Sequence, residues 1–150
     1  MNSTKNNEIG HLLTSSNYDD KVKKVTGGRN GYGAKLTNIF SKKFIVETSD
    51  CHKKKKYFQE FTNNMSVIGS PQITDISSDI EDYTCVTFEP DLKKFKMRSI
   101  DDDTFGLLCK RVYDLAGCTR AGVKVYLNKK QIKGVSNFES YVDMYFKTGS

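Results

Sequence analysis

Apolar and polar residues alternate over residues 55–62 and again over residues 83–89, which is the period-two pattern of half-buried strands. Residues 44–48 are rich in β-branched and aromatic side chains and predict a third strand. Residues 50–54 separate the first strand from the second, so these two are expected to form an antiparallel hairpin. Pro90 is expected to end the strand over 83–89, because proline cannot donate a ladder hydrogen bond.

The clearest helical spacing lies over residues 104–116. Asp101 or Ser99 can cap this helix, and Gly117 is expected to end it. A shorter helix is predicted to open at Gly33 or Ala34 and to run to about Phe40. The apolar residues that set the spacing of the longer helix are Phe105, Leu108, Val112 and Leu115.

Weaker patterns fill the remaining chain. Residues 66–82 predict one short strand and loops, residues 123–127 a strand with a turn at 128–130, and residues 138–145 a short amphipathic segment. Strands outnumber helices and short links join them. An α+β fold with a mixed, mostly antiparallel sheet is therefore favoured over a doubly wound parallel sheet.

Length and composition fit a soluble globular domain: 150 residues, 37% hydrophobic and 28% charged. No apolar run approaches the ~20 residues of a membrane span, and the polar start predicts no secretory signal. The net charge of +6 leans toward a polyanionic partner. Much of that charge lies in residues 53–56, either a DNA contact or a solvated hairpin tip, and the absence of interleaved aromatic residues favours the tip.

The four cysteines have no C-x-x-C spacing, and the chain contains two histidines, His11 and His52. We therefore expect no zinc site and no other metal site. Scattered free thiols in a reducing, intracellular setting are the simplest interpretation.

The most informative segment is a glycine-rich loop over residues 24–36, with four glycines inside seven residues. Glycines let backbone N–H groups turn toward a phosphate, and the following helix start adds unpaired donors and a partial positive charge. The order of the glycines fits neither a P-loop nor a dinucleotide-binding fingerprint. From the glycines alone, a surface turn remains an equal alternative. The candidate residues are Gly28, Arg29, Asn30, Gly31, Tyr32, Gly33, Ala34 and Lys35.

A resemblance decides between these alternatives. Residues 12–20 (LLTSSNYDD) followed by residues 24–36 closely resemble the ATP-lid region of eukaryotic-type type II DNA topoisomerases. Residues 82–92, 113–117, 122–125 and 140–143 also resemble that family, in the same order. The resemblance implies the ATPase fold shared with gyrase, histidine kinases and mismatch-repair ATPases. That fold is a two-layer α/β sandwich with helices on one face of the sheet, here expected in part.

The resemblance also implies site roles. Ser15, Ser16 and Asn17 would contact the nucleotide's sugar and phosphates, and the lid amides with Lys35 would wrap the triphosphate. Arg29 could bind phosphate or pair with Asp19 or Asp20. Thr84 would join the adenine-binding network. Without the resemblance, Ser15–Asn17 would be interpreted as a helix cap and Thr84 as an ordinary strand residue.

Part of the family's machinery is not found in these 150 residues. The chain has no D-x-G-x-G loop, no convincing helix carrying the water-activating glutamate and the magnesium-binding asparagine, and no second-domain lysine. The expectation is a partial domain: a disordered polar start over 1–9, an incomplete ATPase domain over 10–147 with its lid at 18–36, and a tail over 148–150. The catalytic residues and the Mg²⁺ ligand would then lie outside this chain.

The resemblance implies partners and setting as well. The parent enzyme would bind ATP with Mg²⁺, act on DNA by ATP-dependent strand passage, form a homodimer, need no membrane and reside in the nucleus. This chain alone is expected to be nearly inactive. Two alternatives stay open: a catalytically dead nucleotide- or phosphate-binding remnant, and a basic nucleic-acid-binding module.

Overall fold

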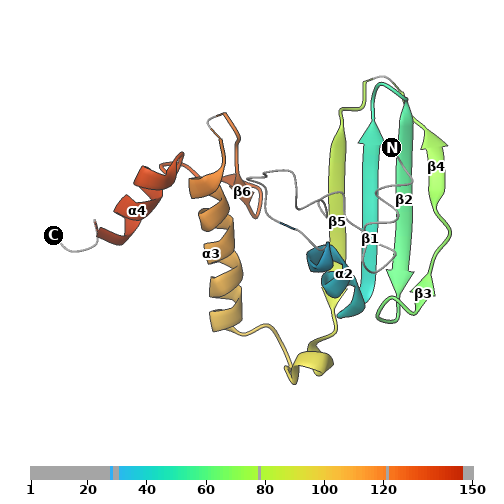
Figure 1. The fold of residues 1–150 in the computed structure, drawn as a ribbon, viewed down its shortest axis with the longest axis horizontal. Coiled ribbons are helices and arrows are strands. Elements are labelled where there is room, and N and C mark those ends of the chain that lie inside the picture. The colour runs from blue at the N-terminus through green and yellow to red at the C-terminus, as the bar shows by residue number, and fades with distance from the viewer. Residues whose placement is uncertain (1–27, 29–30, 78, 121, 147–150) are drawn as a thin grey trace, which may run out of the picture. The chain divides into compact units, whose positions relative to one another are not determined.

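The computed structural model describes residues 28, 31–77, 79–120 and 122–146 (Figure 1). The chain divides into two compact units, residues 1–96 and residues 97–150. Predictions for residues 1–9, for residues 15–17 and for the tail at 148–150 lie outside the described residues.

The first unit is built on an antiparallel sheet (Figure 1). Strand β1 pairs with β5 on one side and with β2 on the other. Two short strands, β3 and β4, pair with successive parts of the outer edge of β2. The strands are β1 (Ser41–Asp50), β2 (Lys55–Thr62), β3 (Val67–Ile68), β4 (Gln72–Asp75) and β5 (Tyr83–Pro90).

Successive side chains of a strand point to opposite faces of the sheet, and the pairing register brings apolar residues of neighbouring strands together on one face. Phe44 lies opposite Phe61 on β2 and opposite Phe88 on β5. Phe44, Val46 and Phe61 are buried and form the core, with Met65 packed against it. The rings of Phe44 and Phe61 meet edge to face at 6.3 Å between centroids, a favourable aromatic geometry.

The opposite face carries polar side chains. Lys56 Nζ lies 2.8 Å from the Glu47 carboxylate, and the Tyr83 hydroxyl donates to the same carboxylate at 2.6 Å. The hydrogen bond from Lys56, followed by that from Tyr83, lowers the pKa of Glu47. Lys43 and Glu60 form a second cross-strand pair at 3.0 Å. Because these ion pairs are partly exposed, they add little to the stability of the sheet. They favour the observed pairing register between neighbouring strands.

Helix α2 (Tyr32–Ile39) packs against β1 and β5, and the short helix η1 (Leu92–Phe95) follows β5. The rings of Phe40 and Phe95 lie 5.2 Å apart between centroids. Leu36 and Phe88 line one groove with these rings, so α2 lies over the apolar face of the sheet.

The second unit contains two helices and a small hairpin: α3 (Asp102–Cys118), β6 (Tyr126–Leu127), β7 (Lys130–Gln131) and α4 (Phe138–Phe146). Asp101 caps α3, because its Oδ1 accepts a hydrogen bond of 2.8 Å from the Thr104 amide. Asn128 and Lys129 both have positive φ and make the two-residue turn between β6 and β7. Among the described residues, no helix is long and apolar enough to cross a membrane.

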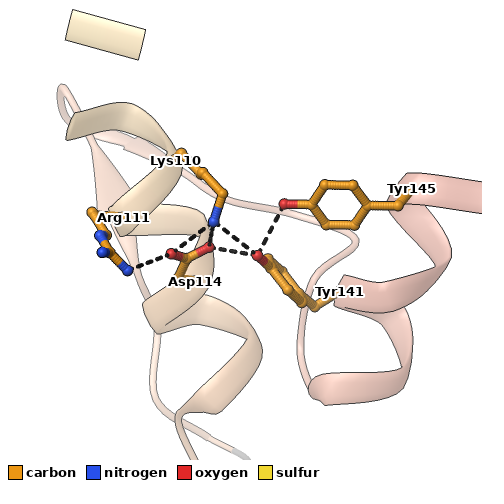
Figure 2. Close-up of polar contacts among 5 residues, drawn as sticks. All are labelled: Lys110, Arg111, Asp114, Tyr141 and Tyr145. Atoms are coloured by element: carbon orange, nitrogen blue, oxygen red, sulfur yellow. Dashed lines mark hydrogen bonds and ion pairs between the residues drawn. The ribbon is translucent and has the colours of Figure 1, made fainter. Parts of the chain in front are cut away.

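A polar cluster joins α3 to α4 (Figure 2). The Tyr141 hydroxyl donates to Asp114 Oδ1 at 2.5 Å, and Lys110 Nζ donates to both oxygens of that carboxylate at 2.8 and 3.0 Å. Arg111 contributes a longer bond of 3.3 Å, and the Tyr145 hydroxyl lies 3.0 Å from that of Tyr141. These bonds hold the two helices in one packing arrangement.

The predicted α+β class is confirmed, and every strand pair among the described residues is antiparallel. Three local predictions were wrong. Gly117 lies inside α3, which continues to Cys118, because the lack of a Cβ lets Tyr141 pack against it. The segment 66–82 contributes two short strands, since β2 offers its whole outer edge for pairing. The strand expected over 123–127 is confined to Tyr126–Leu127.

Candidate functional site

The structure describes seven of the twelve residues predicted to bind nucleotide: Gly28, Gly31, Tyr32, Gly33, Ala34, Lys35 and Thr84. The other five, Ser15, Ser16, Asn17, Arg29 and Asn30, lie outside the described residues. The candidate site is therefore built from the end of the lid, the first turn of α2 and strand β5.

Helix α2 begins directly after Gly31, one residue or two before the predicted start. Gly31 is the N-cap and adopts left-handed backbone angles, φ 64° and ψ 24°, which favour glycine. It has no side chain to cap the helix, and the first turn contains no acidic residue. The amide groups at this end have no acceptor within their own helix, and the helix dipole adds partial positive charge, so the end suits an anion.

Gly33 lies in the first turn of α2, and the fold shows no packing need for it. A Cβ built on Gly33 would meet no atom of the described residues within 4 Å, and its φ is not positive. Glycine inside a helix is less stable than alanine by about 0.5–1 kcal/mol. A ligand that approaches the backbone of Gly33 closely would require such an open space and the absence of a side chain.

Lys35 lies one turn further into α2 and is fully buried. Its Nζ donates a hydrogen bond of 3.0 Å to the carbonyl oxygen of Gly31, so the ammonium is directed back to the end of the glycine-rich loop. The charge and the uncapped amides therefore occupy the same end of the helix. A lysine in this place can bind phosphate as a point charge.

Asn38, which no sequence motif singled out, is fully buried beside Lys35 at i+3. Neither its amide nitrogen nor its oxygen has a hydrogen-bond partner among the described residues. By contrast, the apolar Leu36 of the same helix is 48% exposed. The i, i+3 spacing of Lys35 and Asn38 was the available signal, but polar residues usually mark the solvent side of a helix.

Thr84 lies on β5 opposite Thr48 of β1 and is exposed. The two hydroxyls are 3.1 Å apart, and Thr48 Oγ1 also donates to the Tyr83 carbonyl at 2.9 Å. Alternation along β5 puts Thr84 on the same face as Phe88, which is the face that α2 covers in part. A cavity of about 410 Å³ opens beside Thr84, lined in part by Thr48 and Tyr57.

Comparisons with known proteins show similarity over nearly the whole chain. No family model matches the sequence. DNA topoisomerase 2 from Arabidopsis thaliana is 58% identical over 142 residues, which are 95% of this chain and 10% of that protein. DNA topoisomerase 2 from Saccharomyces cerevisiae is 54% identical over 140 residues, and human DNA topoisomerase 2-alpha is 56% identical over 139.

Solved structures give the same result. The ATPase region of Saccharomyces cerevisiae topoisomerase II superposes with a TM-score of 0.89 at 52% identity, covering 96% of this chain and 37% of that one. The ATPase and transducer domains of DNA topoisomerase II from Balamuthia mandrillaris give a TM-score of 0.87 at 48% identity. The chain is thus homologous to the ATPase region of eukaryotic type II DNA topoisomerases over nearly its whole length, and the predicted resemblance is confirmed. It spans about a tenth of the length of the curated relatives.

Proposed function

We propose that this chain is the ATP-binding segment of a type II DNA topoisomerase, in which the lid backbone and Lys35 cradle the triphosphate. The observation that carries the proposal is the first turn of α2. There an uncapped helix end, an unfilled space beside Gly33 and the Lys35 ammonium lie together.

The proposed roles follow from these positions. The amides of residues 31–34 would donate to phosphate oxygens, and Lys35 would contribute the full positive charge. Arg29 and Asn30 of the lid, with Ser15, Ser16 and Asn17, are proposed as further nucleotide contacts. Thr84, beside its cavity, is proposed to face the adenine. We assign no Mg²⁺ ligand to this chain.

The activity of the parent enzyme is part of the same proposal. The parent would couple ATP binding to passage of one DNA duplex through another, as a homodimer in the nucleus. We propose further that these 150 residues alone turn over little ATP. A missing general base typically lowers a rate by about 10²–10⁴, and robust Mg²⁺-dependent phosphate release by the purified chain would contradict this.

Calorimetric titration of the purified chain tests the proposal, with Mg·ATP and inorganic tripolyphosphate as ligands. Lys35→Met keeps most of the buried aliphatic stem and removes the charge. We expect it to weaken binding of both ligands by about 10- to 100-fold, which is the range of a hydrogen bond to a charged group. The control is Lys42→Ala, since the Lys42 side chain is 54% exposed and lies 3.6 Å from Glu89. Equal binding by both variants and the wild type would refute the role of Lys35.

A further inference from the structure

The turn between β1 and β2 brings together three side chains that the proposed nucleotide site does not use. Cys51 and His52 are the first two residues of this turn, and Asp82 immediately precedes β5. The Cys51 sulfur, a ring nitrogen of His52 and a carboxylate oxygen of Asp82 all lie within 4.8 Å of one another. The sequence separates Asp82 from the other two by about thirty residues, and the pairing of β1 with β5 brings them together.

Several hydrogen bonds hold these segments in place. Asp82 Oδ1 accepts a bond of 2.6 Å from the Cys51 amide. The Ser49 hydroxyl bonds the two residues that flank Asp82 in the chain. It donates to the Glu81 carbonyl at 2.6 Å and accepts from the Tyr83 amide at 3.1 Å. Ser49 is buried. The Asp82 carboxylate is therefore oriented by its neighbours, as a metal-binding carboxylate commonly is.

The cluster is also chemically selective. A thiolate, an imidazole and a carboxylate are ligands that Zn²⁺ and related first-row ions take, whereas Mg²⁺ and Ca²⁺ prefer oxygen alone. Ligand atoms about 2.0–2.3 Å from a tetrahedral zinc ion lie roughly 3.3–3.8 Å apart. Rotation of side chains on this turn would have to bring the three ligand atoms from within 4.8 Å of one another to that spacing.

We infer that Cys51, His52 and Asp82 form a three-ligand site for Zn²⁺ or a similar transition-metal ion. The fourth position of the tetrahedron is open. His52 and Asp82 both line the cavity of about 410 Å³ beside β1 and β5, so water or another small donor can reach that position. Binding replaces the Cys51 thiol proton with the metal. This cavity is the one beside Thr84 that is proposed to receive the adenine, but the three metal-binding side chains are not among the proposed nucleotide contacts, so metal binding can be tested without nucleotide.

The charges around the site moderate its affinity. Metal binding releases the Cys51 thiol proton, so affinity is expected to rise with pH. Lys53 also lines the cavity, while Lys55 is paired with Asp75 at 2.6 Å. Asp50, whose Oδ1 accepts from the Lys53 amide at 3.0 Å, contributes a further negative charge. A reversible site is expected here, weaker than a closed four-ligand structural zinc site.

Cobalt(II) titration of the reduced, metal-free chain tests the site, because tetrahedral thiolate-bound Co²⁺ absorbs in the near-ultraviolet and the visible. We expect one equivalent of Co²⁺ to produce both bands and Zn²⁺ to displace it. Cys51→Ser should abolish the near-ultraviolet band. His52→Ala and Asp82→Asn should each weaken binding by tenfold or more, the latter while keeping an acceptor for the Cys51 amide.

Cys85→Ser is the matched control, since Cys85 is an exposed free cysteine on β5 of the same unit. It should leave the spectrum and the affinity unchanged. Circular dichroism of each variant verifies that it is folded. The inference is overturned if the wild type gives no thiolate band, if Cys51→Ser binds Co²⁺ as the wild type does, or if Cys85→Ser reduces binding equally.

Discussion

Gly117 of α3 packs directly against Tyr141 of α4, and a Cβ added to Gly117 would lie 2.6 Å from the Cβ of Tyr141. Real Cβ atoms do not approach so closely, so the two helices meet at a glycine because nothing larger fits. The Tyr141 hydroxyl also donates to Asp114 of α3, so Tyr141 joins the two helices both by packing and by a hydrogen bond (Figure 2).

Gly117→Ala is therefore expected to destabilise the protein by about 1–3 kcal/mol through overpacking. Gly106→Ala in the same helix is the control, because a Cβ there meets no described atom within 4 Å. That control should raise stability by about 0.5–1 kcal/mol through helix propensity. Urea denaturation measures both, and equal effects of the two substitutions would contradict the packing argument.

The bond between Tyr141 and Asp114 predicts a dependence of stability on alkaline pH. The hydrogen bond to the carboxylate raises the pKa of Tyr141 to about 12, whereas an unfolded tyrosine titrates near pH 10. The folded state thus holds the phenol proton more tightly. The stabilisation is complete below pH 10 and is lost as the pH rises toward 12.

Tyr141→Phe should remove this contribution, so its stability should differ from that of the wild type at pH 8 and converge with it as the pH approaches 12. The Asp114 carboxylate also raises the pKa of Lys110, which therefore loses its charge as the pH rises. Because Lys110 is present in both proteins, its titration contributes to both stability curves. Tyr126→Phe, at an exposed position in the same unit, serves as the comparison. A constant difference between Tyr141→Phe and wild type across the range would show that the bond does not titrate.

The core of the first unit predicts a large effect at Phe61, which is 1% exposed and meets Phe44 edge to face. Phe61→Ala should cost about 3–5 kcal/mol, from lost burial and from the cavity left behind. Phe88→Ala lies on the same face but starts from 50% exposure, and it should cost clearly less. Denaturation curves that rank the two in the opposite order would place the core elsewhere.

The regular elements were largely predictable because local patterns determine them. The alternation over residues 55–62 and 83–89 correctly predicted β2 and β5, and Asp101, one of the two predicted caps, is the N-cap of α3. The end of α3 was not predictable. Gly117 is a typical helix terminator in sequence, but here it is a packing position against Tyr141, and that contact is not visible in the local pattern.

The site was less predictable than the fold, since it depends on which side chains of α2 point toward the protein interior. Lys35 and Asn38 are fully buried while Leu36 is half exposed, the reverse of their hydrophobicity. The expectation of no metal site rested on the missing C-x-x-C spacing and on the presence of only two histidines, and the cluster of Cys51, His52 and Asp82 has no motif spacing that would have indicated it. Pairing between β1 and β5 creates that cluster, and no local pattern encodes it.

The central claim is that bare backbone at the start of α2 approaches a triphosphate, and Gly33→Ala tests it most directly. Tripolyphosphate affinity and urea stability are measured on the same preparation. We predict that the variant is as stable as the wild type, or about 0.5–1 kcal/mol more stable, and binds tripolyphosphate at least tenfold more weakly. Unchanged affinity in a folded variant would show that no phosphate comes near Gly33 and would contradict the account.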